Sequence, residues 1–308
     1  MGWIDKALHE ARQKRESEGP KKKDQARPKR SEKVAPPEVQ PAPKPQQPKS
    51  SPAVQAQEAA KSRAQVSQLR SNQVYKPARR VEVNNQVLQQ NRILTAVQDP
   101  GITSAYKMLR TRVLQRMRAN NWNSLAVTST APGDGKTTTS INLAISLAKN
   151  VNHNVFLVDL DLRRPSIHRY FGFKPKRGLG DYLLGKASPE DIVVDPGVER
   201  LNIIPNDHPF DNSSEQLSSP KMLKLVEYLT TSDPSRIIVF DTPPLLVTDD
   251  MLAFSPYIDA IMLVVSEGKT KREEIQRATH LLQDTNVLGT VLNRSSESAS
   301  GYGYGYYY

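Results

Sequence analysis

Short apolar segments alternate with amphipathic segments through the last two thirds of the chain. The apolar segments are rich in β-branched residues, as in SLAVTST, NVFLVDLD, RLNIIP, SRIIVFDTPP, DAIMLVVSE and LGTVLNR. Between them, apolar residues recur at helical spacing in TTTSINLAISLAKN, SPKMLKLVEYLTT and KREEIQRATHLLQDT. Strands that alternate with helices predict an α/β fold with a mostly parallel sheet, helices on both faces, and ligands at the carboxyl ends of the strands.

The N-terminal quarter has a different composition. Residues 1–80 contain 19 Lys and Arg against 8 Asp and Glu, which accounts for the whole formal net charge of +11. Eleven of the 23 prolines lie within the first 100 residues, and Gln is frequent there. Low hydrophobicity with high charge predicts a disordered, basic, Pro/Gln-rich linker over residues 19–95, before the folded domain.

Residues 1–18 are predicted to form a short amphipathic helix, because Trp3, Ile4, Ala7 and Leu8 share one side. Three interpretations stay open: a frayed terminal helix, a docking helix for a partner, and a weak attachment to an anionic membrane surface. The linker has no aromatic residue before Tyr75 that stacks on bases, so we expect no specific nucleic-acid binding.

The chain has no cysteine, which excludes disulfides, thiolate zinc sites and iron–sulfur clusters. Its longest apolar run, IDAIMLVV, is far shorter than a membrane span and contains Asp259. The N-terminal segment lacks the apolar region of a signal peptide. We therefore expect a cytoplasmic protein.

The strongest motif is TAPGDGKTTT at residues 130–139, between a predicted strand and a predicted helix. In a phosphate loop, glycines let backbone N–H groups close around phosphate oxygens, a lysine reaches the β and γ oxygens, and a hydroxyl ligates Mg²⁺. Thr130 stands where the general pattern has glycine. The predicted nucleotide-binding residues are Pro132, Gly133, Asp134, Gly135, Lys136, Thr137 and Thr138.

Carboxylates end two further predicted strands. Asp159 and Asp161 in VFLVDLDLRRP lie two residues apart, which places both side chains on one side of an extended chain. Asp241 ends IIVFDTPP at the Walker B position, where a carboxylate holds Mg²⁺ directly or through water. We predict ATP and Mg²⁺ as ligands, with Thr137, Asp159 and Asp241 holding the metal. The alternative for Asp159 and Asp161 is a pair of solvated acids that open a loop.

The motifs APGDGKTT, VDLDLRRP and VFDTPP, in this order, resemble the bacterial tyrosine kinases of exopolysaccharide and capsule biosynthesis, the BY-kinases. The resemblance covers roughly residues 100–308 and includes the closing segment SGYGYGYYY. It implies a P-loop tyrosine kinase domain over residues 96–295 and a flexible tyrosine-rich tail over residues 296–308. It also implies an ATP-dependent autokinase that regulates exopolysaccharide synthesis or export, with transfer between neighbouring subunits. The implied phosphoacceptors are Tyr302, Tyr304, Tyr306, Tyr307 and Tyr308.

The resemblance also implies roles for the catalytic residues. Lys136 holds the phosphates, and Asp241 helps to organise Mg²⁺. Asp159 is implied as the residue that receives the tyrosine proton, with Asp161 assisting, but the residues alone allow the two roles to be exchanged. Arg163 either stabilises charge during transfer or braces the loop.

A second class of protein shares these elements. Partitioning and site-selection ATPases of the ParA and MinD type have the same sheet, phosphate loop and Walker B strand, and they act as membrane- or surface-associated switches. Their loop has a lysine five residues before the catalytic one, where this chain has Ala131. We keep a regulatory ATPase of this type as the alternative function.

Two departures from the kinase family concern assembly. The Glu-x-x-Arg-x-x-Arg pattern of the family contacts the neighbouring subunit, and the corresponding residues here are Ser104, Lys107 and Arg110. A ring-shaped homo-oligomer is therefore expected with a degenerate motif, because lysine cannot form the two-pronged contact of arginine. Many family members are fused to, or activated by, a transmembrane chain-length-determinant protein. We expect a separate activator protein of this kind, and peripheral association with the inner membrane through it.

Overall fold

The computed structural model describes residues 78–295 except residues 151 and 234. The predicted N-terminal helix, residues 19–77 of the predicted linker and the tyrosine-rich tail therefore lie outside the described residues. Within the described ranges, no helix has the length and apolar content that a membrane crossing requires.

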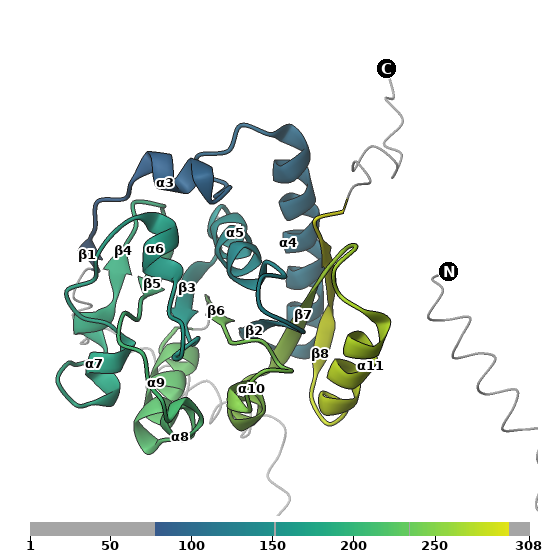
Figure 1. Cartoon of the computed structure of the whole chain (residues 1–308). Helices are drawn as coiled ribbons and strands as arrows, with labels where there is room; N and C mark the ends of the chain where they lie inside the picture. Colours follow the sequence, from purple (N-terminus) through teal and green to yellow (C-terminus); the bar gives the residue numbers. More distant parts are fainter. Residues whose placement is uncertain (1–77, 151, 234, 296–308) are drawn as a thin grey trace, which may run out of the picture. The chain divides into compact units, whose positions relative to one another are not determined.

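An eight-stranded sheet forms the centre of this part of the chain, with the strand order β1-β4-β5-β3-β6-β2-β7-β8 (Figure 1). Neighbouring strands are parallel except for the antiparallel pair β4 and β5. This arrangement confirms the predicted α/β fold with a mostly parallel sheet. The strands are β1 (Arg79–Arg80), β2 (Ser124–Ser129), β3 (Asn154–Asp159), β4 (Val194–Asp195), β5 (Leu201–Ile204), β6 (Arg236–Asp241), β7 (Ala260–Ser266) and β8 (Val287–Asn293).

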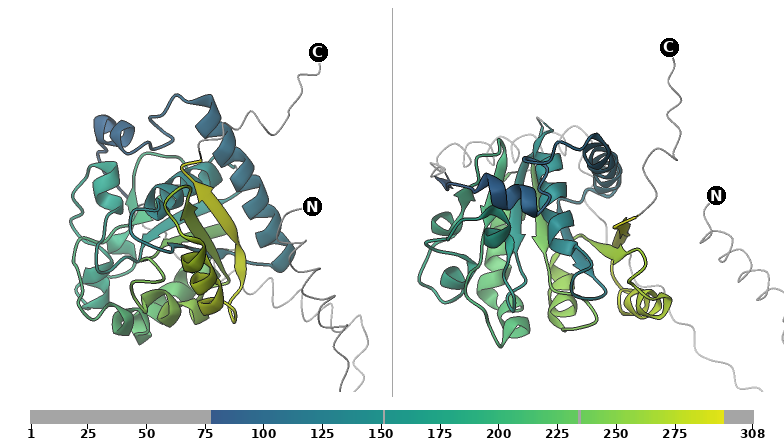
Figure 2. Two further views of the ribbon diagram at one scale, coloured as in Figure 1. Left: turned by 45° about the vertical axis from the view of Figure 1, so that its right-hand side comes forward. Right: turned by 45° about the horizontal axis from the view of Figure 1, so that its top comes forward.

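Helices cover both faces of the sheet, as Figures 1 and 2 show. Helices α3, α4, α5 and α6 contribute to one buried apolar cluster, and α7 to α11 contribute to a second cluster. Strand β2 supplies Leu125 and Val127 to the first cluster and Ala126 to the second, as alternation along a strand requires. The helices are α3 (Asn85–Gln90), α4 (Pro100–Asn120), α5 (Lys136–Ala148), α6 (Ile167–Phe171), α7 (Leu179–Leu183), α8 (Ser213–Leu217), α9 (Pro220–Thr231), α10 (Asp250–Phe254) and α11 (Arg272–Leu281), with 3-10 turns η1 (Glu190–Ile192) and η2 (Ser255–Tyr257).

Residues 79–95 differ from the predicted linker, because they fold onto the domain. Strand β1 pairs with β4, and α3 lies beside α6 (Figure 1). The side chain of Asn84 caps α3 by accepting hydrogen bonds from two backbone N–H groups of its first turn. Leu88, Ile93 and Leu94 are buried in the first apolar cluster. Composition averaged over residues 1–95 hides this short segment, whose apolar residues have a local pattern of their own.

Candidate active site

The candidate site lies where three adjacent parallel strands end. In the register of the sheet, Asp159 of β3 is opposite Asp241 of β6, and Asp241 is also opposite Val127 of β2. Strand β2 continues into the phosphate loop, which leads into α5. The order β3-β6-β2 therefore brings the predicted carboxylates and the phosphate loop to one edge of the sheet.

Two glycines give the phosphate loop its shape. Gly133 and Gly135 have φ angles of 79° and 95°, in the left-handed region that favours glycine. A Cβ atom on Gly135 would lie 2.0 Å from Nδ2 of Asn293, which itself donates to the carbonyl of Asp134 at 2.9 Å. The end of β8 thus packs directly against the loop.

The buried carboxylate of Asp134 stabilises the phosphate loop through hydrogen bonds within the loop. Its Oδ2 accepts hydrogen bonds of 2.9 Å from the Thr130 hydroxyl and from the backbone N–H of Ala131. From the loop after β7, the Nζ atom of Lys269 lies 3.1 Å from Oδ1 of Asp134 and donates to the carbonyl of Pro132 at 2.6 Å. These contacts explain Thr130, because its hydroxyl is part of the network that closes the loop where the general pattern has glycine.

The Lys136 ammonium lies among carboxylates. Its Nζ atom is 2.9 Å from Oδ2 of Asp161 and 3.7 Å from Oδ2 of Asp241. Burial by itself lowers the pKa of Lys136, but the nearby charges of Asp241 and Asp161 outweigh it and raise that pKa above its ordinary value. Lys136 is therefore charged across the physiological pH range.

Asp241 accepts hydrogen bonds from two hydroxyl groups of α5. Thr137 donates to its Oδ2 at 2.7 Å, and Ser140 donates to its Oδ1 at 3.0 Å. Burial raises the pKa of Asp241, while Lys136 and the two hydroxyls oppose that shift. Ser140 is absent from the predicted site residues, although its position one helical turn after Lys136 places it on the same face of α5.

Asp159 is completely buried. Its Oδ2 accepts hydrogen bonds from the backbone N–H groups of Ser166 at 2.8 Å and Ile167 at 2.9 Å. Its Oδ1 has no hydrogen-bond partner among the described residues. Burial and the charge of Asp241 raise the pKa of Asp159 to about 8, although the two backbone donors act in the opposite direction.

Arg163 contacts a buried acid that the sequence pattern did not indicate. Its Nε atom lies 3.6 Å from Oδ1 of Asp250, the first residue of α10. The same oxygen accepts a hydrogen bond of 2.8 Å from Ser213 of α8. Asp250 is fully buried, and burial raises its pKa. The contact ties the loop after β3 to two helices on the second face of the sheet.

A hollow of about 500 Å³ opens over this site. The phosphate loop, Asp161 and Arg163 line it, whereas Asp159 lies outside its wall. A second hollow of about 660 Å³ shares Gly135, Thr138, Tyr170 and Arg294 with the first. The structure thus brings together Lys136, Thr137, Asp159, Asp161 and Asp241, and it leaves Arg163 at the rim.

The residues of the degenerate assembly motif lie on α4. Ser104 and Lys107 are exposed on this helix. Arg110 donates instead to the backbone carbonyl of Ser146 at 3.0 Å, so it also fixes α4 against α5.

A parallel sheet with a strand–phosphate loop–helix unit, a loop lysine and a Walker B carboxylate defines a P-loop nucleoside triphosphatase, and this class of protein binds nucleotides. Residues 123–283 match a family model described as "AAA domain".

The comparisons with known proteins define the family more narrowly. Tyrosine-protein kinase YwqD of Bacillus subtilis (strain 168) is 33% identical over 203 residues, which are 64% of this chain and 84% of the relative. The crystal structure of the VpsO kinase domain is similar with a TM-score of 0.57 and 33% identity, over 64% of this chain and 96% of that one. The crystal structure of the chimerical protein CapA2B2 is similar with a TM-score of 0.60 and 25% identity, over 70% of this chain and 93% of that one. The chain therefore belongs to the BY-kinase family of bacterial tyrosine kinases, and its relatives are tyrosine-protein kinases of the capsule and exopolysaccharide type.

Proposed function

We propose that this protein transfers the γ-phosphoryl group of ATP to tyrosine hydroxyls of its own C-terminal segment. The observation that carries this proposal is the meeting of Lys136, Thr137, Asp161 and Asp241 beside a hollow that the phosphate loop lines. Phosphoryl transfer requires mainly positioning and charge neutralisation, which is what such a constellation provides.

In the free protein, the positive charge that we propose for binding phosphate is already in place on Lys136. Lys136 is paired with Asp161 and Asp241 before nucleotide binds. Triphosphate oxygens in the loop compete for the same ammonium, so binding of ATP exchanges an internal ion pair for contacts with substrate. The second hollow, with the Tyr170 ring and the Asn293 amide in its wall, supports binding of the nucleoside part of ATP there.

The donor set fits Mg²⁺. Thr137 and Asp241 supply oxygens at one point, and Asp159 has a buried oxygen without a partner. The described residues contain no group of three or more acidic, His or Cys side chains able to hold a metal alone, so substrate phosphates would complete the coordination. We propose Thr137, Asp159 and Asp241 as the residues that hold the metal. When bound, Mg²⁺ neutralises charge on the phosphates.

We propose Asp159 as the group that receives the proton of the acceptor tyrosine. Burial and the charge of Asp241 raise the pKa of Asp159 in the metal-free protein, which is the direction that a general base requires. Asp161 is held by Lys136 and by the backbone N–H of Arg164, so we assign it to orient Lys136 and the acceptor. Arg163 is fixed by Asp250 at the rim, which supports a bracing role.

We further propose that transfer occurs between subunits, and that the acceptors are Tyr302, Tyr304, Tyr306, Tyr307 and Tyr308. A separate transmembrane chain-length-determinant protein activates the kinase at the inner membrane in this proposal. Similarity to the chimerical protein CapA2B2 supports association with a membrane activator. The exposed Ser104 and Lys107 on α4 support a contact between copies at this helix.

Incubation of the purified protein with Mg·ATP, followed by mapping of phosphate by mass spectrometry, tests the proposal. We expect phosphotyrosine in the C-terminal segment and none after Lys136→Met. Hydrolysis of ATP without phosphotyrosine would favour the regulatory ATPase of the ParA and MinD type instead.

A further inference from the structure

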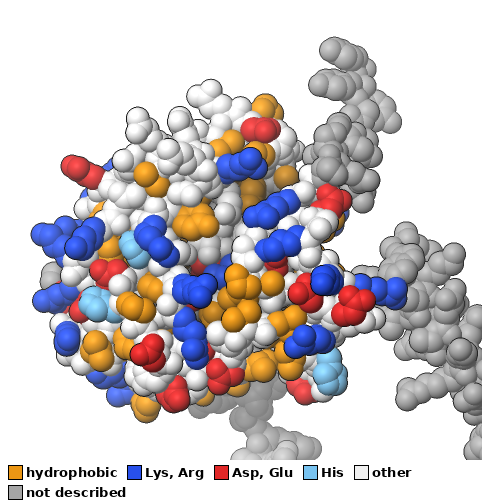
Figure 3. Space-filling model, viewed as in Figure 1, with side chains coloured by type: hydrophobic (Ala, Val, Ile, Leu, Met, Phe, Trp, Pro, Cys, Tyr) orange, Lys and Arg blue, Asp and Glu red, His pale blue; other side chains and the backbone are white. Residues whose placement is uncertain are grey.

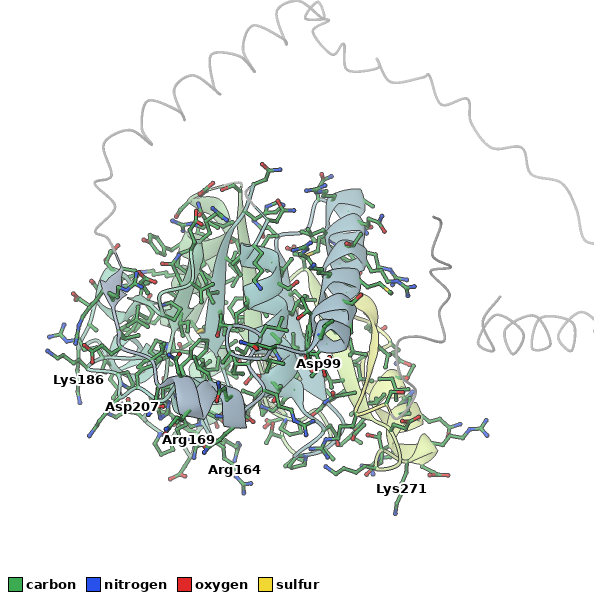
Figure 4. All side chains as sticks on the ribbon, turned by 90° about the horizontal axis from the view of Figure 1, so that it is seen from above. Asp99, Arg164, Arg169, Lys186, Asp207 and Lys271 are labelled. Atoms are coloured by element: carbon green, nitrogen blue, oxygen red, sulfur yellow. The ribbon has the colours of Figure 1, made fainter. Side chains whose placement is uncertain are left out.

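Helix α6 and the loops on either side of it carry a cluster of positive charge. Between Asp161 and Asp181 the sequence LRRPSIHRYFGFKPKRGLG contains six Lys and Arg and no acid. All six side chains are exposed. Figure 3 shows Lys and Arg side chains gathered over the region of α6, and Figure 4 shows Arg164 and Arg169 at the same edge of the molecule.

Four of these cations have no carboxylate partner in the described part of the chain. Arg163 is paired with Asp250, and Arg177 is paired with Asp191 at 3.3 Å. The unpaired set, which we call the α6 basic surface, is Arg164, Arg169, Lys174 and Lys176. Asp207 also lies near this edge (Figure 4), but it contacts His208 at 2.7 Å. The surface therefore presents uncompensated positive charge to solvent.

The α6 basic surface is continuous with the wall of the active site. Arg164 and Tyr170 line the hollow over the phosphate loop. The first N–H groups at the start of α6, from Ser166 and Ile167, bind Asp159. A ligand that leaves the hollow on this side therefore moves from a site rich in carboxylates to a surface rich in cations.

The C-terminal segment begins at the same place. Strand β8 ends at Asn293, and the next residues, Arg294 and Ser295, line the second hollow together with Tyr170 of α6. Thirteen residues follow, and when extended they span at most roughly 43 Å. Five of these residues are tyrosines, and the segment follows directly on Ser295, which lines the same hollow as Tyr170 of α6.

We propose that the α6 basic surface binds the C-terminal segment of this chain after its tyrosines are phosphorylated. This inference rests on the proposed function, because it takes the product of that reaction as its ligand. Each phosphotyrosine carries a charge of about −1.5 to −2 and three acceptor oxygens, which Arg and Lys side chains bind in charge-assisted hydrogen bonds. The unphosphorylated segment SGYGYGYYY has no charged side chain. Only the phosphorylated segment therefore carries the negative charge that complements the cations of the α6 basic surface.

The same charges make return to the active site unfavourable. Asp161 and Asp241 lie within the site, and each added phosphate is repelled by their negative charge when no cation lies between. The α6 basic surface adjoins the site through Arg164, and its cations have no carboxylate partner among the described residues. Binding to this surface would hold the phosphorylated C-terminal segment next to the active site but outside the hollow.

Direct binding of a synthetic peptide to the full, dephosphorylated chain tests this inference. The probe is SGYGYGYYY phosphorylated at Tyr304, Tyr306 and Tyr308, compared with the unphosphorylated peptide by fluorescence anisotropy. We expect the phosphopeptide to bind at least about tenfold more tightly, and the difference to shrink as salt is added. The combined variant Arg169→Gln, Lys174→Gln, Lys176→Gln is expected to lose roughly tenfold in affinity for the phosphopeptide.

A matched control removes the same charge elsewhere. Lys149→Gln, Lys224→Gln and Arg277→Gln replace an exposed cation directly after α5 and exposed cations of α9 and α11, and this variant should bind the phosphopeptide as the wild type does. Equal binding of the two peptides, or equal losses in both triple variants, would overturn the proposal. Vesicles containing phosphatidylserine that bind through the same residues, without a preference for the phosphopeptide, would show a lipid surface instead. Because the peptide already carries phosphate, the result does not depend on whether the protein is a kinase.

Discussion

At the scale of single residues, Lys136 balances the charges of the site. Its ammonium is 2.9 Å from Asp161 and 3.7 Å from Asp241, and its side chain is only 11% exposed. A cation in this position is a structural counterion in the free protein and a ligand for phosphate in the complex. Its replacement therefore has two separable effects.

Lys136→Met should abolish nucleotide binding and phosphotyrosine formation, because no other described side chain in the loop is cationic. The two carboxylates are then left without a counterion, and we expect a loss of stability on the order of 3 kcal/mol at neutral pH. The loss should be smaller at pH 5, because burial raises the pKa of Asp241 and protonation of this carboxyl removes part of the uncompensated charge. Thermal unfolding at both pH values and isothermal titration with ATP measure these effects. Wild-type labelling in this variant would remove the phosphate-loop assignment.

Asp159 gives the stability of the free protein a dependence on pH. Its folded pKa of about 8 is raised above the ordinary value of 3.8. The folded state therefore holds the proton more tightly than the unfolded state, so the contribution is fully present below pH 3.8 and is lost as pH rises towards about 8. One such proton corresponds to a slope of about 1.4 kcal/mol per pH unit.

The variant Asp159→Asn cannot titrate at this position. We expect its free energy of unfolding to change less steeply between pH 5 and pH 8 than that of the wild type, when measured with denaturant and without nucleotide. Asp250→Asn is a useful comparison, because burial raises the pKa of Asp250 as well and its removal should leave the slope due to Asp159 in place. Identical slopes in the wild type and Asp159→Asn would show that Asp159 does not hold a proton in this range.

At the scale of elements, helix α3 and the turn after it complete the first face of the sheet. Asn142 of α5 accepts a hydrogen bond from the N–H of Leu94 at 2.9 Å and donates to the carbonyl of Arg92 at 3.0 Å. Leu88, Ile93 and Leu94 pack in the same apolar cluster as α4 and α5. We infer that the folded domain begins near residue 78.

A chain that begins at residue 96 should therefore be less stable than one that begins at residue 78. Removing three buried aliphatic side chains costs at least about 3 kcal/mol, which corresponds to a decrease in Tm on the order of 10 °C. The chain that begins at residue 78 should unfold at the same temperature as the full chain. Calorimetry on all three tests this, and equal Tm values would place the domain boundary after α3.

Hydrophobic periodicity predicted most of this fold, because each buried strand is a local apolar run. The phosphate loop and Asp159, Asp161 and Asp241 were also predictable, since they directly follow strands whose ends meet at one sheet edge. Asp250 and Lys269 were not, because their roles depend on contacts between segments far apart in the chain. Lys269, for example, lies 137 residues from the Pro132 carbonyl that it contacts. Ser140 could have been inferred from its position one helical turn after Lys136.

At the scale of the whole molecule, the relation between the site and its acceptor depends on where the C-terminal segment can reach. The segment starts at the rim of the hollows that Arg294 lines, so its own active site is within reach of an extended chain. Glycines at positions 301, 303 and 305 let the chain fold back. Length therefore allows transfer within one subunit and between two, and only an experiment with two distinguishable copies separates them.

Two variants provide such copies. One carries Lys136→Met and has acceptors without activity; the other has all five terminal tyrosines replaced by phenylalanine and has activity without those acceptors. Alone, the first should show no label and the second only a small amount, because phenylalanine keeps the ring and removes the hydroxyl. Mixed with Mg·ATP, they should give phosphotyrosine on the Lys136→Met chain, at a rate that rises with total protein concentration, if transfer occurs between subunits. A size tag on one variant lets electrophoresis assign the label. Absence of label in the mixture, with normal labelling of the wild type, would show transfer within one subunit and overturn the intersubunit proposal.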